Sequence, residues 1–116
     1  MPYAALHNHS WFSLLDSPVP PEQLASAAEA CGMTAIALTD RDTLAGAVAF
    51  WKKCRDLGLH AVTGAEVTLE DSSTLVLLVE NTRGYSNLCR LLTTRIDHPA
   101  GVTWTDLARF SDGLIC

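Results

Sequence analysis

Short apolar runs alternate with amphipathic stretches along this chain, and that alternation constrains its fold more than any other feature of the sequence. Residues 34–38 and 74–79 are apolar or β-branched runs of strand length. Between and around them, apolar side chains recur at helical spacing, as in Leu24, Ala27, Ala28 and Cys31. The pattern predicts an α/β fold made of βα units, in which consecutive strands are mainly parallel.

Turn and cap residues set the expected boundaries of these elements. Prolines are favoured in the first turn of a helix, glycine follows its last turn, and Asp or Thr caps its start. Further extended segments are expected at residues 3–6, 60–63 and 65–69. The first expected helix has Pro20-Pro21 in its first turn and ends at Gly32. The second is capped by Asp42, ends at Gly58, and has a buried face made of Leu44, Ala47, Val48 and Trp51. A third is expected from about Gly84 to Thr94, and a fourth, capped by Thr103, over residues 104–110.

The length of 116 residues allows one domain at most. A closed (β/α) barrel usually takes on the order of 250 residues, so these units would make only part of one. If these units belong to such a barrel, more than a third of it lies outside residues 1–116, and an open three-layer sheet is the alternative that 116 residues could complete.

Charge, hydropathy and cysteine spacing indicate what the chain binds and in which compartment it works. A net charge of −5 does not favour direct binding to DNA, which requires a basic face. The sequence contains no apolar run long enough to cross a membrane and has no basic residue before Arg41, so we expect a cytoplasmic protein. The cysteines are widely spaced, which favours buried reduced thiols over disulfides or zinc: Cys31, Cys54, Cys89 and Cys116.

Imidazoles and carboxylates follow the expected strand ends. His7 and His9 come after the first run, Asp40 and Arg41 come after the second, and Glu66 lies near the end of a third. In parallel α/β folds, loops converge at the carboxyl ends of the strands, so these side chains should meet at one rim.

A metal site is the chemistry that such a rim suggests. Residues two apart in extended backbone point the same way, so His7 and His9 could face one ion, with Asp16 arriving from the next loop. Histidine and carboxylate ligands suit zinc, manganese or iron, whose bound water becomes a nucleophile near neutral pH. The competing interpretation is that His-x-His arose by chance and its rings bind backbone groups.

Other polar residues have simpler interpretations. His60 and His98 fall where surface histidines are common. Ser10 and Ser13 lack a neighbouring His–Asp arrangement that would activate them, so hydrogen bonding within the loop is favoured. No catalytic nucleophile is assigned.

Several of these segments resemble the signatures of the PHP (polymerase and histidinol phosphatase) domain. The run from His7 to Asp16 is similar to the opening H-x-H-S signature, and residues 35–43 are similar to a strand that ends in Thr-Asp-His. Residues 64–66, Gly-Ala-Glu, resemble a third signature. Residues 75–92 resemble the stretch that follows the third signature in DNA polymerase III alpha-type subunits. Within it, the sequence of residues 87–93 favours the error-prone branch of these polymerases.

The resemblance implies a partial, distorted (β/α) barrel of the PHP type with mainly parallel strands, in which residues 1–116 are the N-terminal part of a single, truncated domain. It also implies that four residues stand at metal-ligand positions: His7, His9, Asp16 and Glu66. Arg41 stands where the family usually has a histidine, and because a guanidinium cannot act as a ligand, at least one ion should be weakened or lost. Arg41 could instead be a fixed cation that pairs with Asp40, Asp16 or Glu66.

The resemblance also implies a role within a larger polymerase of DNA replication or repair. The expected function is a structural PHP segment with a partly degenerate phosphoesterase site, whose divalent metal could be lost. Its partner would be the rest of the polymerase polypeptide, and DNA would be reached only through that parent protein. The alternatives are an autonomous metal-dependent phosphoesterase and a non-catalytic interaction domain. An isolated fragment could form a homodimer through unpaired strand edges.

Overall fold

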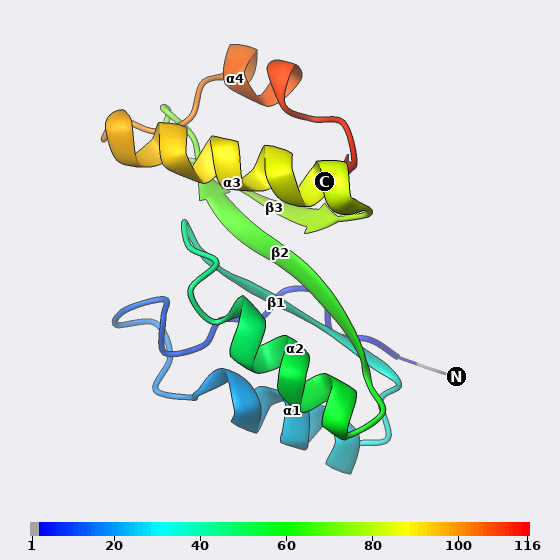
Figure 1. The fold of residues 1–116 in the computed structure, drawn as a ribbon. Coiled ribbons are helices and arrows are strands. Elements are labelled where there is room, and N and C mark those ends of the chain that lie inside the picture. Colours follow the sequence, from blue (N-terminus) through cyan, green and yellow to red (C-terminus); the bar gives the residue numbers. More distant parts are fainter. Residues whose placement is uncertain (1–2) are drawn as a thin grey trace.

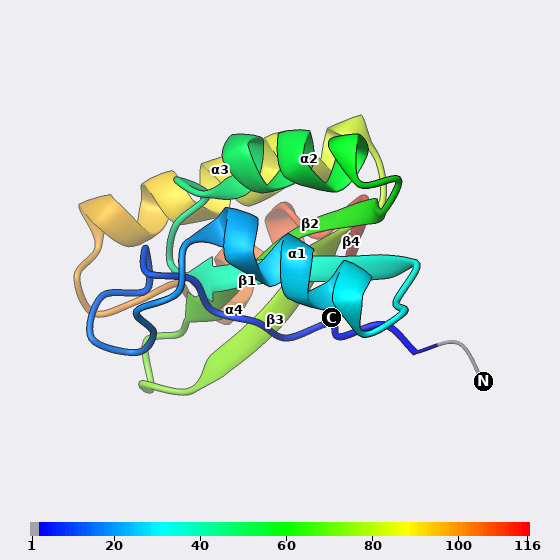
Figure 2. The same cartoon turned by 90° about the horizontal axis from the view of Figure 1, so that it is seen from below.

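A computed structural model describes residues 3–116. Helices cover one side of a four-stranded sheet, and the N-terminal segment runs beside the first strand (Figures 1 and 2). In chain order, the elements are α1 (Pro21–Ala30), β1 (Ala35–Arg41), α2 (Ala47–Asp56), β2 (His60–Thr68), β3 (Thr74–Val79), α3 (Thr82–Asp97), α4 (Trp104–Arg109) and β4 (Leu114–Ile115).

The strand order is β1-β2-β3-β4, which follows the chain. β1 and β2 are parallel and are joined through α2, whereas the β2–β3 and β3–β4 pairs are antiparallel. The expectation of mainly parallel strands is therefore wrong for this sheet. Only residues 69–73 separate β2 from β3, and a parallel crossover needs a dozen residues or more. Residues 3–6 contribute a single bridge, between Ala5 and Ile36, instead of a full strand.

The two extended segments expected at residues 60–69 form one continuous strand, β2. Gly64 lies in its middle and is needed there, because a Cβ atom would come within 2.5 Å of the Leu77 carbonyl oxygen on β3. The mixed α/β class is confirmed.

Two helices follow the sequence prediction at their starts. Pro21 opens α1, and Thr103 caps α4 in a capping box with Asp106. α3 is longer than expected at both ends. It starts earlier because Asn81 caps it by accepting a hydrogen bond from the Gly84 amide.

The predicted start and buried face of α2 are wrong. Asp42 does not cap this helix, which begins at Ala47; its carboxylate accepts hydrogen bonds from the Thr68 amide and hydroxyl at the end of β2. Val48 and Trp51 are exposed, and the buried face of α2 carries Phe50 and Cys54 instead.

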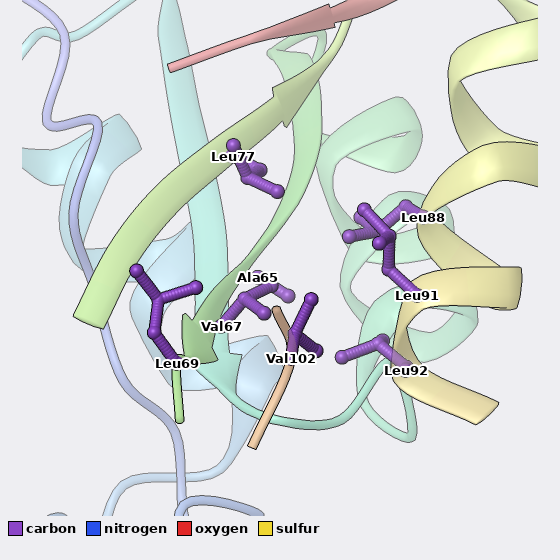
Figure 3. Packing of buried hydrophobic residues seen from close by; sticks show 8 residues of the cluster. All are labelled: Ala65, Val67, Leu69, Leu77, Leu88, Leu91, Leu92 and Val102. Atoms are coloured by element: carbon purple, nitrogen blue, oxygen red, sulfur yellow. The ribbon is translucent and has the colours of Figure 1, made fainter. Parts of the chain in front are cut away.

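Two apolar clusters hold the helices to the sheet. The first joins alternate residues of β2, including Ala65 and Val67, to Leu77 of β3 and to Leu88 and Leu91 of α3 (Figure 3). The second joins α1 and α2 to Ile36 and Leu38 of β1. Because strand side chains alternate between faces, residues between these apolar ones, such as the buried Glu66, point to the opposite face of the sheet.

The cysteines only partly follow the expectation. All four are free thiols, but only Cys54 is buried; Cys31 and Cys116 are exposed. Burial raises the pKa of the Cys54 thiol. No helix within residues 3–116 has the length and apolarity required to span a bilayer.

Candidate metal centre

The N-terminal segment reaches the site because it is hydrogen-bonded to β1. The Ala37 and Thr39 amides donate to the carbonyl oxygens of Ala5 and Asn8. The Asn8 side chain donates in turn to the Ala5 and Ala37 carbonyl oxygens, at 3.0 and 2.8 Å. Asn8 thus fixes the backbone between the two histidines, a role that the sequence did not signal.

His7, His9 and Glu66 converge on one spot. Each offers a ligand atom, and these atoms lie within 4.8 Å of one another. His7 Nε2 is 2.9 Å from Glu66 Oε1, and His9 Nε2 is 3.4 Å from Glu66 Oε2. The two imidazole rings meet edge to face, with centroids 5.4 Å apart. The expected gathering of imidazoles and a carboxylate beside the strand ends is therefore present.

Arg41 brings a permanent positive charge to the same spot. Its Nε lies 3.0 Å from Glu66 Oε2 and its Nη1 lies 3.0 Å from Asp16 Oδ2. The contact with Glu66 follows from the sheet, since Arg41 and Glu66 are directly opposite each other in the β1–β2 register. Asp16 also lies 3.8 Å from His9 Nδ1, so it contacts the site mainly through Arg41.

The charges at this site favour ionised Glu66. Burial alone would raise the Glu66 pKa, but hydrogen bonds from Arg41 and His7 and the charge of His9 outweigh it and hold the pKa below its usual value. The hydrogen bond to Glu66 raises the pKa of Arg41, with a further contribution from Asp16. Both groups are therefore charged near neutral pH.

Asp40 has a different role from the other site residues. Its side chain is buried and accepts hydrogen bonds from the Ser10 amide at 2.6 Å, the Ser10 hydroxyl at 2.7 Å and the Ser13 hydroxyl at 2.8 Å. Asp40 therefore holds the loop after His9 in place. Of the three carboxylates expected as partners of Arg41, it is Asp16 and Glu66 that form ion pairs with it. The two serines make the loop hydrogen bonds that the sequence suggested, while His60 and His98 are exposed.

The residues present fit one divalent ion in part. His9 Nε2 is buried and has no hydrogen-bond partner within the described residues, as expected for a nitrogen atom that is available to bind a metal ion. His7 Nε2 and Glu66 lie close enough to complete a three-ligand set. Arg41, however, already binds the Glu66 oxygen that faces His9.

The PHP domain family matches residues 5–116. The chain belongs to this family. The matched residues include those of every helix and strand, so the kinship rests on nearly the whole sequence as well as on the short motifs.

The curated relatives are polymerases. The PHP chain is 46% identical over 91 residues to the error-prone DNA polymerase of Pseudomonas fluorescens, a match that covers 78% of the chain and 9% of the relative. It is 43% identical over 93 residues to the error-prone DNA polymerase of Symbiobacterium thermophilum, which covers 80% of the chain and 9% of that protein. The PHP chain therefore spans less than a tenth of the length of these relatives.

Solved structures confirm the fold at lower identity. An amidohydrolase from Chromobacterium violaceum, with bound sulfate and no metal, matches with a TM-score of 0.64 at 22% identity over 83% of the chain and 34% of its own. A protein from Bifidobacterium adolescentis, described as a putative metal-dependent phosphoesterase, matches with a TM-score of 0.61 at 19% identity. The match covers 94% of this chain and 43% of that protein's chain.

Proposed function

We propose that this chain is the opening part of a PHP domain within an error-prone-type DNA polymerase, and that its site is mainly structural. The observation that carries this proposal is the double contact of Arg41 with Asp16 and Glu66, each at 3.0 Å. A guanidinium is always charged and supplies no lone pair, so it balances the two carboxylates without a metal.

A weak metal-dependent phosphoesterase site remains part of the proposal. His7, His9 and Glu66 would hold one ion, which when bound would polarise the oxygen of a phosphate ester. Arg41 would orient Glu66 and supply a second positive charge toward an anionic substrate. The ligand set does not distinguish zinc from manganese or iron.

The fold supports the proposed partner, the remainder of a polymerase polypeptide within a larger PHP-type barrel. β4 pairs only with Leu78 and Val79, so the rest of the β3 edge has no strand beside it among residues 3–116. Next to this edge, Leu75, Trp104 and Leu107 line an apolar hollow of about 320 Å³. Isolated copies could pair through this edge, and a mass that rises with concentration in light scattering would reveal it.

Metal content and hydrolysis test the proposal together. Elemental analysis of the purified chain should find substoichiometric metal, and added manganese or zinc should give negligible hydrolysis of a generic phosphate ester. Stoichiometric metal, with activity that His9→Ala abolishes and that the exposed control His60→Ala retains, would instead establish an autonomous phosphoesterase. Full retention of stability in Arg41→Gln would contradict the structural role of the Arg41 ion pairs and would favour a non-catalytic interaction domain.

A further inference from the structure

A second polar site lies away from the histidines, in a hollow of about 680 Å³ between the first half of α3 and the end of α4. Its lining residues are hydroxyl, amide and guanidinium side chains with one carboxylate: Thr82, Arg83, Ser86, Asn87, Arg90, Arg109 and Asp112. The far end of α3 is the one near the candidate metal centre, because Arg95 lies 3.4 Å from Asp42 there. The hollow and the metal centre are therefore separate places.

The spacing of the polar residues on α3 gives the hollow one continuous wall. Residues 82, 83, 86, 87 and 90 follow each other at the intervals that place side chains on one helix face. Arg83 and Arg90 lie about two turns apart on this face, with the Ser86 hydroxyl between them. Hydrogen-bond donors thus line the wall over a length of roughly 10 Å.

The opposite wall is held close to α3. Gly84 and Gly113 are in such tight contact that a side chain on Gly84 would overlap the Gly113 carbonyl group. The Asn87 amide donates to the Asp112 carbonyl oxygen at 2.8 Å. The turn before β4 is therefore fixed against the helix, and the shape of the hollow is built into the fold.

Two of the three guanidinium groups are brought together by one aromatic ring. The Cζ atoms of Arg90 and Arg109 lie 6.0 and 5.2 Å from the centroid of Phe110. Within residues 3–116, neither of these arginines has a carboxylate oxygen within 4.0 Å, whereas Arg83 is 3.0 Å from Asp112 Oδ2. Three of the chain's six arginines therefore share a hollow with one acidic group, in a protein whose net charge is −5.

We propose that this hollow binds a phosphate group through Arg83, Arg90 and Arg109, with the Thr82 and Ser86 hydroxyls as further donors. Guanidinium groups match the geometry of phosphate oxygens, and stacking on Phe110 leaves their N–H groups free for such contacts. The start of α3 adds backbone N–H groups, whose partial positive charge attracts an anion such as phosphate. The volume leaves room for the remainder of a phosphate monoester or a phosphodiester beside the bound group.

Titrations with two probes in the presence of a chelator test this site. Inorganic pyrophosphate and a short single-stranded oligothymidylate are each added at low salt, while the arginine Nε–H signals are followed by NMR. Shifts of the Arg90 and Arg109 signals are expected with at least one probe. Shifts with pyrophosphate alone identify a free phosphate compound as the ligand, and shifts with the oligonucleotide identify the backbone of a strand. No shift with either probe overturns the proposal.

Two matched pairs of variants separate this site from general electrostatic attraction. Arg90→Gln should weaken binding by about tenfold, whereas Arg55→Gln, which removes the same charge from α2, should leave it unchanged. Asp112→Asn frees Arg83 and should tighten binding, whereas Asp56→Asn should not. This gain in affinity cannot come from misfolding. Equal effects of the members of either pair would overturn the proposal.

Discussion

Arg41 determines what the site can do, because it places a permanent cation between two carboxylates. It stands at the last position of β1, directly opposite Glu66 in the sheet register. Its side chain is 48% exposed, whereas that of Glu66 is 7% exposed, so the contact stabilises a nearly buried charge from its solvent side. The ligand atoms of the two histidines that flank Glu66 lie within 4.8 Å of it and of one another, so under the proposed function the site is only partly degenerate.

The buried carboxylate of Asp40 should contribute more to the free energy of unfolding than an exposed carboxylate does. Replacing it with Asn removes the charge that accepts three hydrogen bonds from Ser10 and Ser13, and should lower the free energy of unfolding by about 1–3 kcal/mol. Asp56→Asn, on the exposed end of α2, should change it by less than about 0.5 kcal/mol. Urea unfolding curves measure both, and equal values would contradict the structural role of Asp40.

Removing the charge of Glu66 should change how stability depends on pH. Its pKa is lowered in the folded chain, so ionised Glu66 stabilises the fold above the unfolded pKa of about 4.3, and this contribution is lost as the pH falls through the lower folded value. Glu66→Gln should therefore flatten the acid limb of the stability curve in metal-free buffer. The same limb in Glu70→Gln, an exposed neighbour, should match the wild type; an unchanged limb in Glu66→Gln would contradict this account.

At the scale of the elements, caps and turns explain both the successes and the failures of the sequence prediction. Pro21 and Thr103 start their helices as expected, because a proline ring or a threonine hydroxyl acts locally. The predicted cap at Asp42 is wrong because the Asp42 carboxylate accepts hydrogen bonds from Thr68, which is distant in sequence. The reversal between β2 and β3 did leave a local signal, the polar run from Glu70 to Ser73, in which Asp71 accepts from the Ser73 amide.

The cap of α4 should loosen in acid. Hydrogen bonds from Thr103 hold the pKa of Asp106 below its usual value, so the ionised cap stabilises the helix above about pH 4 and is lost as the pH falls through the folded pKa. Hydrogen exchange at the start of α4 should accelerate over that range. In Asp106→Asn the acceleration should disappear, and persistence of the same pH dependence would assign it to another group.

At the scale of the whole molecule, one face of the sheet carries the apolar cluster under the helices, and the other face carries the glutamate of the candidate metal centre. Helices cover the face that carries Ala65 and Val67 (Figure 3). Glu66 lies between these two residues in β2, so its side chain points to the other face, where it contacts His7 of the N-terminal segment. The sequence predicted the convergence of His7, His9 and Glu66 because strand ends share an edge. It could not predict that Asp16 would approach mainly Arg41, since the loop that carries it is positioned by hydrogen bonds to Asp40.

The contact between Gly84 and Gly113 should be sensitive to any added side chain, because it joins α3 to the turn before β4. Gly84→Ala places a methyl group against the Gly113 carbonyl and should lower the free energy of unfolding by about 1–3 kcal/mol, despite the better helix propensity of alanine. Thr93→Ala on the exposed side of the same helix serves as the control, with a change below about 0.5 kcal/mol. Thermal or urea unfolding compares the two variants; a more stable Gly84→Ala would show that the contact is loose.

Calorimetric titration of zinc or manganese into Arg41→His, Arg41→Gln and the wild type tests the central claim most directly. The wild type should bind weakly, and Arg41→His should bind about tenfold more tightly or better, because it removes the competing cation and adds an imidazole ligand beside His7, His9 and Glu66. Arg41→Gln removes the cation alone and should fall between them. Equal affinities in all three proteins would contradict the claim that Arg41 occupies the place of a metal.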